Sequence, residues 1–126
     1  MMIFDCFMFF DEEMMLDFRL NYLNKYVDKF VIVESTYTHS GKKRDLLFNM
    51  ENFKKYKDKI HYIVVDNEPD GLSTVYDNDS EDKKNQKYIL NAVKRENYQR
   101  DSIARGLKIT NGEDYIMISD IDEIPN

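Results

Sequence analysis

Two aspartates near the end of the chain have the residue type and the spacing of metal ligands. Asp120-Ile121-Asp122 follows the apolar run 115–118, which predicts a strand. If the chain stays extended beyond that strand, residues two apart point to the same side, so both carboxylates face one cation while Ile121 turns toward the core. Carboxylate oxygens suit hard cations such as Mg²⁺ and Mn²⁺, and the phosphate oxygens of a nucleotide can complete the coordination. Asp-x-Asp is a common spacing, but its place at the end of a strand leads us to predict Asp120 and Asp122 as metal ligands.

Two charged residues interrupt the apolar face of a helix predicted over residues 86–108. The apolar members of that face recur at helical spacing and are Ile89, Val93, Ile103 and Leu107. Glu96 and Arg100 occupy the positions between them. One interpretation is a structural ion pair four residues apart, or an arginine whose stem lies on apolar surface with its charged end in water. The other is that Arg100 points toward the strand ends and binds a diphosphate, with Glu96 orienting its guanidinium group.

Acidic residues follow several of the predicted strands. In an open α/β sheet, ligands bind in the crevice beyond the carboxyl ends of the strands, so these positions are candidates for the site. They are Asp11, Glu34, Asp66 and Asp120. We interpret Asp11 as a helix cap, whereas a ligand contact and a strand-ending role are equally compatible with Asp66. The sequence does not identify a catalytic residue.

Strands and helices alternate along the chain. Runs rich in apolar, β-branched and aromatic residues predict strands at 3–10, 30–33, 60–65 and 115–118. Apolar residues at helical spacing predict helices at 11–28, 46–56 and 86–108. Polar stretches predict loops at 35–44 and 67–84. This alternation predicts the α/β class, with a mostly parallel, Rossmann-like sheet and helices on both of its faces.

The composition is that of a folded, acidic chain. Its 126 residues fit one domain, and a content of 42% apolar and 13% aromatic residues is enough to build a core. The net charge of -6 would repel a polyphosphate backbone. We therefore expect no nucleic-acid partner.

The N-terminal apolar run does not have the pattern of a targeting segment. It contains Asp5, lacks a basic leader and is followed at once by acidic residues, unlike a signal peptide or a membrane span. Cys6 is the sole cysteine, which excludes an intramolecular disulfide and fits a reducing compartment. We expect a soluble, cytoplasmic protein with no membrane segment.

Several segments resemble glycosyltransferase family 17, the family of the β-1,4-mannosyl-glycoprotein β-1,4-N-acetylglucosaminyltransferase. They follow the family's order through the whole chain and are Ile3 to Phe10, Asp28 to Thr36, Thr38 to Lys42, Arg95 to Arg100 and Ser119 to Pro125. The resemblance implies a GT-A fold and a UDP-sugar donor, which we expect to be UDP-N-acetylglucosamine. It also implies transfer of the sugar to a glycan acceptor with inversion.

The resemblance also implies roles for individual residues. Asp120 and Asp122 are similar to the metal-binding Asp-x-Asp of the family, which takes Mn²⁺ or Mg²⁺. Glu34 is similar to the residue after the second strand that meets the uridine. Arg100 and Arg95 are similar to donor-site residues, and His39 and Lys42 match the family's loop pattern without an assigned role.

Members of such a family continue past the Asp-x-Asp. We therefore expect residues 1–126 to form a single partial domain, the nucleotide-sugar-binding half of a GT-A domain truncated after the Asp-x-Asp strand. The acceptor site and the catalytic base would then lie outside it. The alternatives are a non-catalytic module that binds a nucleotide or a metal, and an inactive fragment of such an enzyme.

Overall fold

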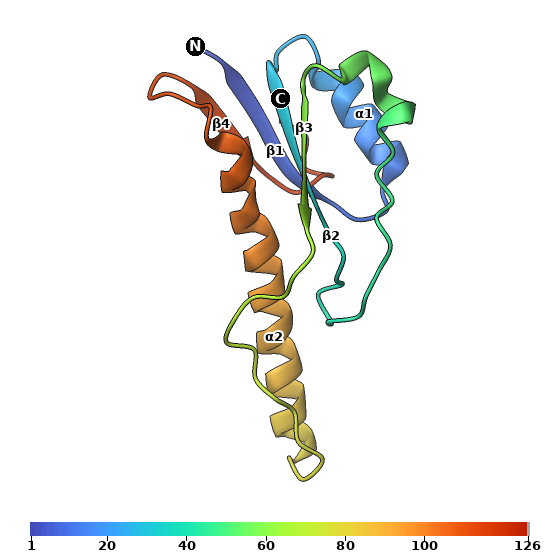
Figure 1. The fold of residues 1–126 in the computed structure, drawn as a ribbon, viewed down its shortest axis with the longest axis vertical. Helices are drawn as coiled ribbons and strands as arrows, with labels where there is room; N and C mark the ends of the chain where they lie inside the picture. Colours follow the sequence, from blue (N-terminus) through green and yellow to red (C-terminus); the bar gives the residue numbers. More distant parts are fainter. Residues whose placement is uncertain (126) are drawn as a thin grey trace.

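The computed structural model describes residues 1–125, and its centre is a parallel sheet of four strands. The strands are β1 (Ile3–Phe9), β2 (Lys29–Ser35), β3 (Ile60–Val65) and β4 (Tyr115–Ile118). They lie in the order β3-β2-β1-β4, and every pair is parallel (Figure 1). The predicted α/β class and parallel sheet are confirmed. Because the chain adds strands first on one side of β1 and then on the other, the strand order reverses between β1 and β4, and ligands of open α/β sheets bind at such a point.

Helices cover both faces of the sheet. On one face lie α1 (Glu13–Leu23) and the 3₁₀ segment η1 (Met50–Tyr56), and on the other lie the end of α2 (Glu81–Asp101) and the 3₁₀ segment η2 (Ser102–Leu107). Alternate residues of β1 serve the two cores, so Phe7 packs under α1 while Cys6 packs under η2. This is why the central strands are apolar without interruption.

Several element boundaries differ from those predicted. The first helix begins at Glu13, its N-cap is Glu12, and no side chain caps it, so the prediction of an Asp11 cap is wrong. The chain bends at Phe10 and Asp11, which moves the start of the helix along the chain. The helix also ends at Leu23 rather than near residue 28. The second strand extends to Ser35, which places Glu34 inside it.

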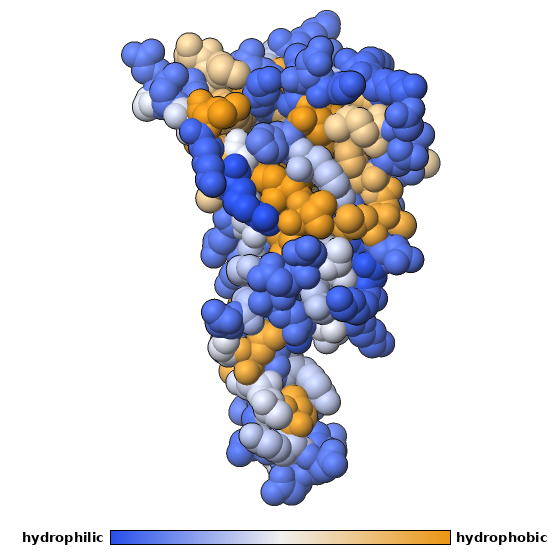
Figure 2. All heavy atoms as spheres, viewed as in Figure 1, coloured by the Kyte–Doolittle hydropathy of each residue, from blue (hydrophilic) through white to orange (hydrophobic). Residues whose placement is uncertain are grey.

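The N-terminal half of α2 projects beyond the sheet, together with the segment that precedes it (Figure 1). That segment is tied to the helix by hydrogen bonds from the Ser73 amide to Asn91 Oδ1 (2.8 Å) and from Asn91 Nδ2 to the Ser73 carbonyl (2.9 Å). The prediction that this helix face packs on the core is wrong for its first half, because Ile89 and Val93 are 64% and 46% exposed. Apolar side chains are visible on the surface of this projecting part in Figure 2.

The second half of the predicted face is confirmed. Ile103 is buried against the sheet and Leu107 packs partly buried against the same core, both in η2 rather than in the α-helix proper. Within residues 1–125, no helix combines the length and the apolar character needed to cross a membrane.

Candidate functional site

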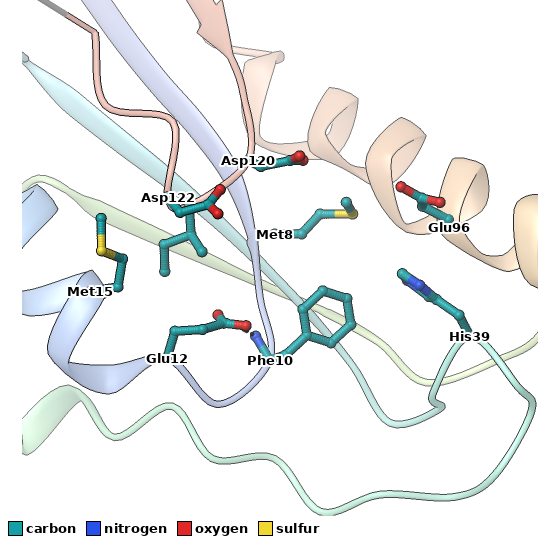
Figure 3. Close-up of a pocket in the computed structure, with 9 residues that line it drawn as sticks. Met8, Phe10, Glu12, Met15, His39, Glu96, Asp120 and Asp122 are labelled. Carbon is teal, nitrogen blue, oxygen red and sulfur yellow. Dashed lines mark hydrogen bonds between the residues drawn. The ribbon is translucent and has the colours of Figure 1, made fainter.

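A cavity of about 270 Å³ opens where β1 and β4 end, at the reversal of strand order. Figure 3 shows its lining, which comes from the end of β1, the start of α1, the loop after β2, the middle of α2 and the turn after β4. The lining residues are Met8, Phe10, Glu12, Met15, His39, Glu96, Asp120, Ile121 and Asp122. Five elements or connections thus meet beyond the carboxyl ends of the strands.

The Asp-x-Asp segment forms a tight turn. The Glu123 amide donates to the Asp120 carbonyl (2.9 Å), and the Asp120 amide donates to Glu123 Oε1 (3.0 Å). The expectation of an extended chain is therefore wrong, because the first bond closes the backbone into a turn and the second ties the Glu123 side chain across it. Even so, Asp120 and Asp122 border the same cavity (Figure 3). Ile121 between them is 7% exposed and belongs to the core under α1.

Arg100 lies beside the first of these aspartates. Its Nη2 is 3.2 Å from Glu96 Oε1 and 3.5 Å from Asp120 Oδ1. The side chains of all three residues are partly exposed, so water can reach this charge cluster. The ion pair between Glu96 and Arg100 is thus present, and it holds the guanidinium group at the end of β4. Both predicted interpretations agree with this position.

Arg95 supports the loop after β2 rather than lining the cavity. Its Nε donates to Glu68 Oε1 (2.9 Å) and its Nη1 donates to the His39 carbonyl (3.1 Å). The loop comes so close that a β-carbon at Gly41 would lie 2.5 Å from Arg95 Nη2. The His39 ring packs edge-on against Phe10 and borders the cavity.

Glu34 is fully buried, and protein groups occupy both of its carboxylate oxygens. It accepts hydrogen bonds from the amides of Leu47 (2.7 Å) and Phe48 (3.1 Å) and from the Tyr62 hydroxyl (2.6 Å). Arg44 Nη2 lies 3.0 Å from Glu34 Oε2. Burial and the hydrogen bond to Glu34 raise the pKa of Tyr62 well above its ordinary value. Glu34 therefore anchors residues 44–48 to the sheet.

Asp66 is not brought together with the other predicted site residues. It is exposed at the end of β3, and β3 is separated from β4 by two strands. It is not among the residues that line the cavity.

The sequence did not predict a buried ion pair that lies beneath the site. Arg19 and Asp5 have fully buried side chains, and Arg19 Nη2 lies 2.6 Å from Asp5 Oδ1. A signal for both was present, since Asp5 interrupts an apolar strand and Arg19 lies on the helix face that carries Leu16 and Leu23. Their spacing of 14 residues gave no indication that they meet.

Four carboxylates line the cavity, so it favours a cation. They belong to Glu12, Glu96, Asp120 and Asp122. No three His, Cys, Asp or Glu side chains within residues 1–125 lie close enough together to hold a metal ion by themselves. A site with one or two carboxylates, completed by phosphate oxygens and water, is the usual arrangement for Mg²⁺ in nucleotide-binding proteins. The residues present fit a cation that binds together with a phosphorylated ligand.

Comparison with known proteins gives one match. The family model described as glycosyltransferase family 17 matches residues 1–126, the whole chain. Neither the curated proteins nor the solved structures include a significant match.

Proposed function

The chain belongs to glycosyltransferase family 17, and from this premise we propose that it binds UDP-N-acetylglucosamine and takes part in transfer of the sugar to a glycan acceptor with inversion. Family membership supports glycosyl transfer in general. The observation that carries the specific proposal is the position of Asp120 and Asp122 at one cavity where the strand order reverses, with Arg100 Nη2 3.5 Å from Asp120 Oδ1. Carboxylates for a cation and a guanidinium group for phosphate are the pair of functions that a nucleotide diphosphate requires.

In the proposed complex, Asp120 and Asp122 hold Mn²⁺ or Mg²⁺ together with the diphosphate. When bound, the cation supplies positive charge that stabilises the negative charge developing on the UDP leaving group. Arg100, now 3.5 Å from Asp120, is close enough to the same region to pair with a phosphate oxygen. Glu96 keeps the guanidinium group oriented through its own contact at 3.2 Å.

Arg95 and Glu34 would support the donor site by fixing the loop after β2. Arg95 holds the backbone of His39, and Glu34 holds the amides of Leu47 and Phe48. A buried carboxylate with this many donors does not need a ligand to satisfy it. Asp66 is left out of the proposed site because it is exposed on the strand farthest from Asp120.

Calorimetry with UDP-N-acetylglucosamine and Mn²⁺ tests the proposal. We expect binding that requires the metal and that Asp122→Ala abolishes, because one of the two carboxylates for the cation is lost. Asp17→Ala is the matched control, since Asp17 is exposed on α1 and does not line the cavity. Unchanged binding in Asp122→Ala would disprove the proposed site.

An assay of turnover distinguishes an enzyme from a module that only binds its ligands. Release of UDP, in the presence or absence of a glycan acceptor, would exclude a module that only binds the nucleotide or the metal. Metal-dependent binding without any release of UDP would agree with both the binding module and an inactive fragment of such an enzyme.

A further inference from the structure

Arg19 is an arginine without access to solvent, directly beneath the Asp-x-Asp turn. It extends from the core-facing side of α1, where the neighbouring positions are leucines. Its Nε donates to Asp5 Oδ2 (2.8 Å) and its Nη2 donates to Asp5 Oδ1 (2.6 Å), which is a bidentate pair. Its guanidinium carbon lies 4.7 Å from the centre of the Phe7 ring. The charge of Arg19 is thus neutralised from the side of the sheet.

The remaining donors of Arg19 all go to the turn after β4. Nη1 donates to the backbone carbonyls of Asp120 (2.8 Å), Ile121 (3.2 Å) and Glu123 (3.1 Å). Nη2 also donates to Ser119 Oγ (2.7 Å). One side chain therefore binds the backbone on both sides of Asp122, and an arginine has no further N–H groups to offer.

These contacts fix how the turn is oriented. Carbonyls that converge on one buried guanidinium group point into the protein, while the carboxylates of Asp120 and Asp122 border the cavity on the other side. A lysine could not replace this arrangement, because its single ammonium group cannot satisfy a carboxylate and several carbonyls at once. Asp5 is also required, since an unpaired buried cation is strongly unfavourable and would oppose a second cation nearby.

We propose that Arg19, held by Asp5, is the positioning residue that sets the shape of the Asp-x-Asp turn and so prepares Asp120 and Asp122 to receive the cation. This inference rests on the proposed function for its consequence in metal binding. Its structural part, control of the turn, can be measured without any ligand.

The test uses a double variant, Asp5→Leu with Arg19→Met, that removes the pair without leaving a buried charge. Replacing a buried ion pair by apolar residues of similar volume is often neutral or stabilising, so a folded protein is expected and its thermal melt verifies it. Arg19→Lys is the second variant, because it keeps a positive charge beside Asp5 but loses most contacts to the turn. Arg105→Lys is the control, since Arg105 also donates to a backbone carbonyl, that of Val64, away from the turn.

Two readouts are needed. The first is amide hydrogen exchange of residues 119–123 without ligand, which should become faster in both Arg19 variants while exchange in β1 and β2 is unchanged. The second is the Mn²⁺ dissociation constant in the presence of UDP-N-acetylglucosamine. We expect it to rise about 10- to 100-fold, the usual effect of losing a group that orients metal ligands. The control should match the wild type in both.

The outcomes separate this inference from the proposed function. If the wild type does not bind Mn²⁺ with UDP-N-acetylglucosamine, the proposed function fails, and the exchange data alone decide whether Arg19 shapes the turn. If the wild type binds but folded Arg19 variants bind equally well and exchange residues 119–123 at the wild-type rate, the positioning role is refuted. If the double variant does not fold, the same criteria apply to Arg19→Lys.

Discussion

At the scale of single residues, Asp120 is where several charged groups of the site meet. Its carboxylate lies 3.5 Å from Arg100 Nη2, and its carbonyl accepts from Arg19 Nη1 at 2.8 Å. Arg100 is partly exposed, whereas Arg19 is fully buried. The exposed arginine can exchange Asp120 for a ligand, but the buried one cannot do so without leaving Asp5 unpaired.

Arg100→Met should separate donor binding from metal binding. Loss of a hydrogen-bonding cation from the diphosphate should weaken binding of UDP-N-acetylglucosamine roughly 10- to 100-fold, because such a bond contributes about 1.5–3 kcal/mol. Binding of Mn²⁺ alone should stay equal or become tighter, because a competing positive charge leaves Asp120. Calorimetry of each ligand measures both effects. Wild-type affinity for the donor would instead favour a purely structural ion pair with Glu96.

Cys6 should be chemically inert in the folded protein. Burial raises the pKa of its thiol from 9.0 to about 12, so the reactive thiolate is scarce at any pH below that range. A chromogenic thiol reagent at pH 8 should react only after urea unfolds the chain. Because the folded pKa is the higher one, stability should fall as the pH rises from about 9 toward 12, where only the unfolded thiol loses its proton. Rapid reaction of the native protein would contradict this burial.

At the scale of elements, the sequence predicted most of the sheet because its two central strands, β1 and β2, are buried on both faces. Continuous apolar runs such as 30–33 leave few alternatives to a central strand, and the order of strands and helices then limits the topology. The first helix was predictable for a similar reason, since its leucines recur at helical spacing.

The structural predictions fail where the conformation or burial of a segment is decided by residues far away in the sequence. The apolar face through Ile89 and Val93 has helical spacing, but no part of the sheet extends far enough to cover it. The Asp-x-Asp was predicted to stay extended, yet Glu123 and Arg19 close it into a turn. Periodicity reports which face of an element is apolar, and it carries no information on what covers that face.

Two substitutions along the predicted apolar face should change the stability of the protein by very different amounts. Ile103→Ala should destabilise the protein by about 2–5 kcal/mol, since it removes a buried side chain between η2 and the sheet. Ile89→Ala, at a position 64% exposed, should change stability by no more than about 0.5 kcal/mol. Urea unfolding followed by circular dichroism measures both. A large loss from Ile89→Ala would mean that another surface covers the projecting part of α2 in solution.

At the scale of the whole molecule, the β4 edge of the sheet is both unpaired and apolar. Within residues 1–125, no strand pairs with the outer edge of β4. Three of its side chains are markedly exposed, Tyr115 at 63%, Ile116 at 42% and Ile118 at 52%. Unpaired backbone groups next to exposed apolar side chains are the usual cause of association between edges of sheets.

We therefore expect the isolated chain to self-associate as its concentration rises. Ile118→Lys should reduce this association, because a charge on an edge strand opposes pairing with another edge. Size-exclusion chromatography over a range of concentrations measures the effect, with Ile109→Lys as a control at an exposed isoleucine outside β4. A monomer at every concentration would show that the exposed edge is tolerated.

The turn at Gly41 makes the cavity sensitive to a position whose own atoms do not border it. The φ angle of +90° is one that L-residues rarely adopt, and a β-carbon there would force the guanidinium end of Arg95 to move. Arg95 holds the backbone of His39, whose ring borders the cavity. A genetic screen for sugar transfer should therefore select against most replacements of this glycine, although a map of ligand contacts would leave it out.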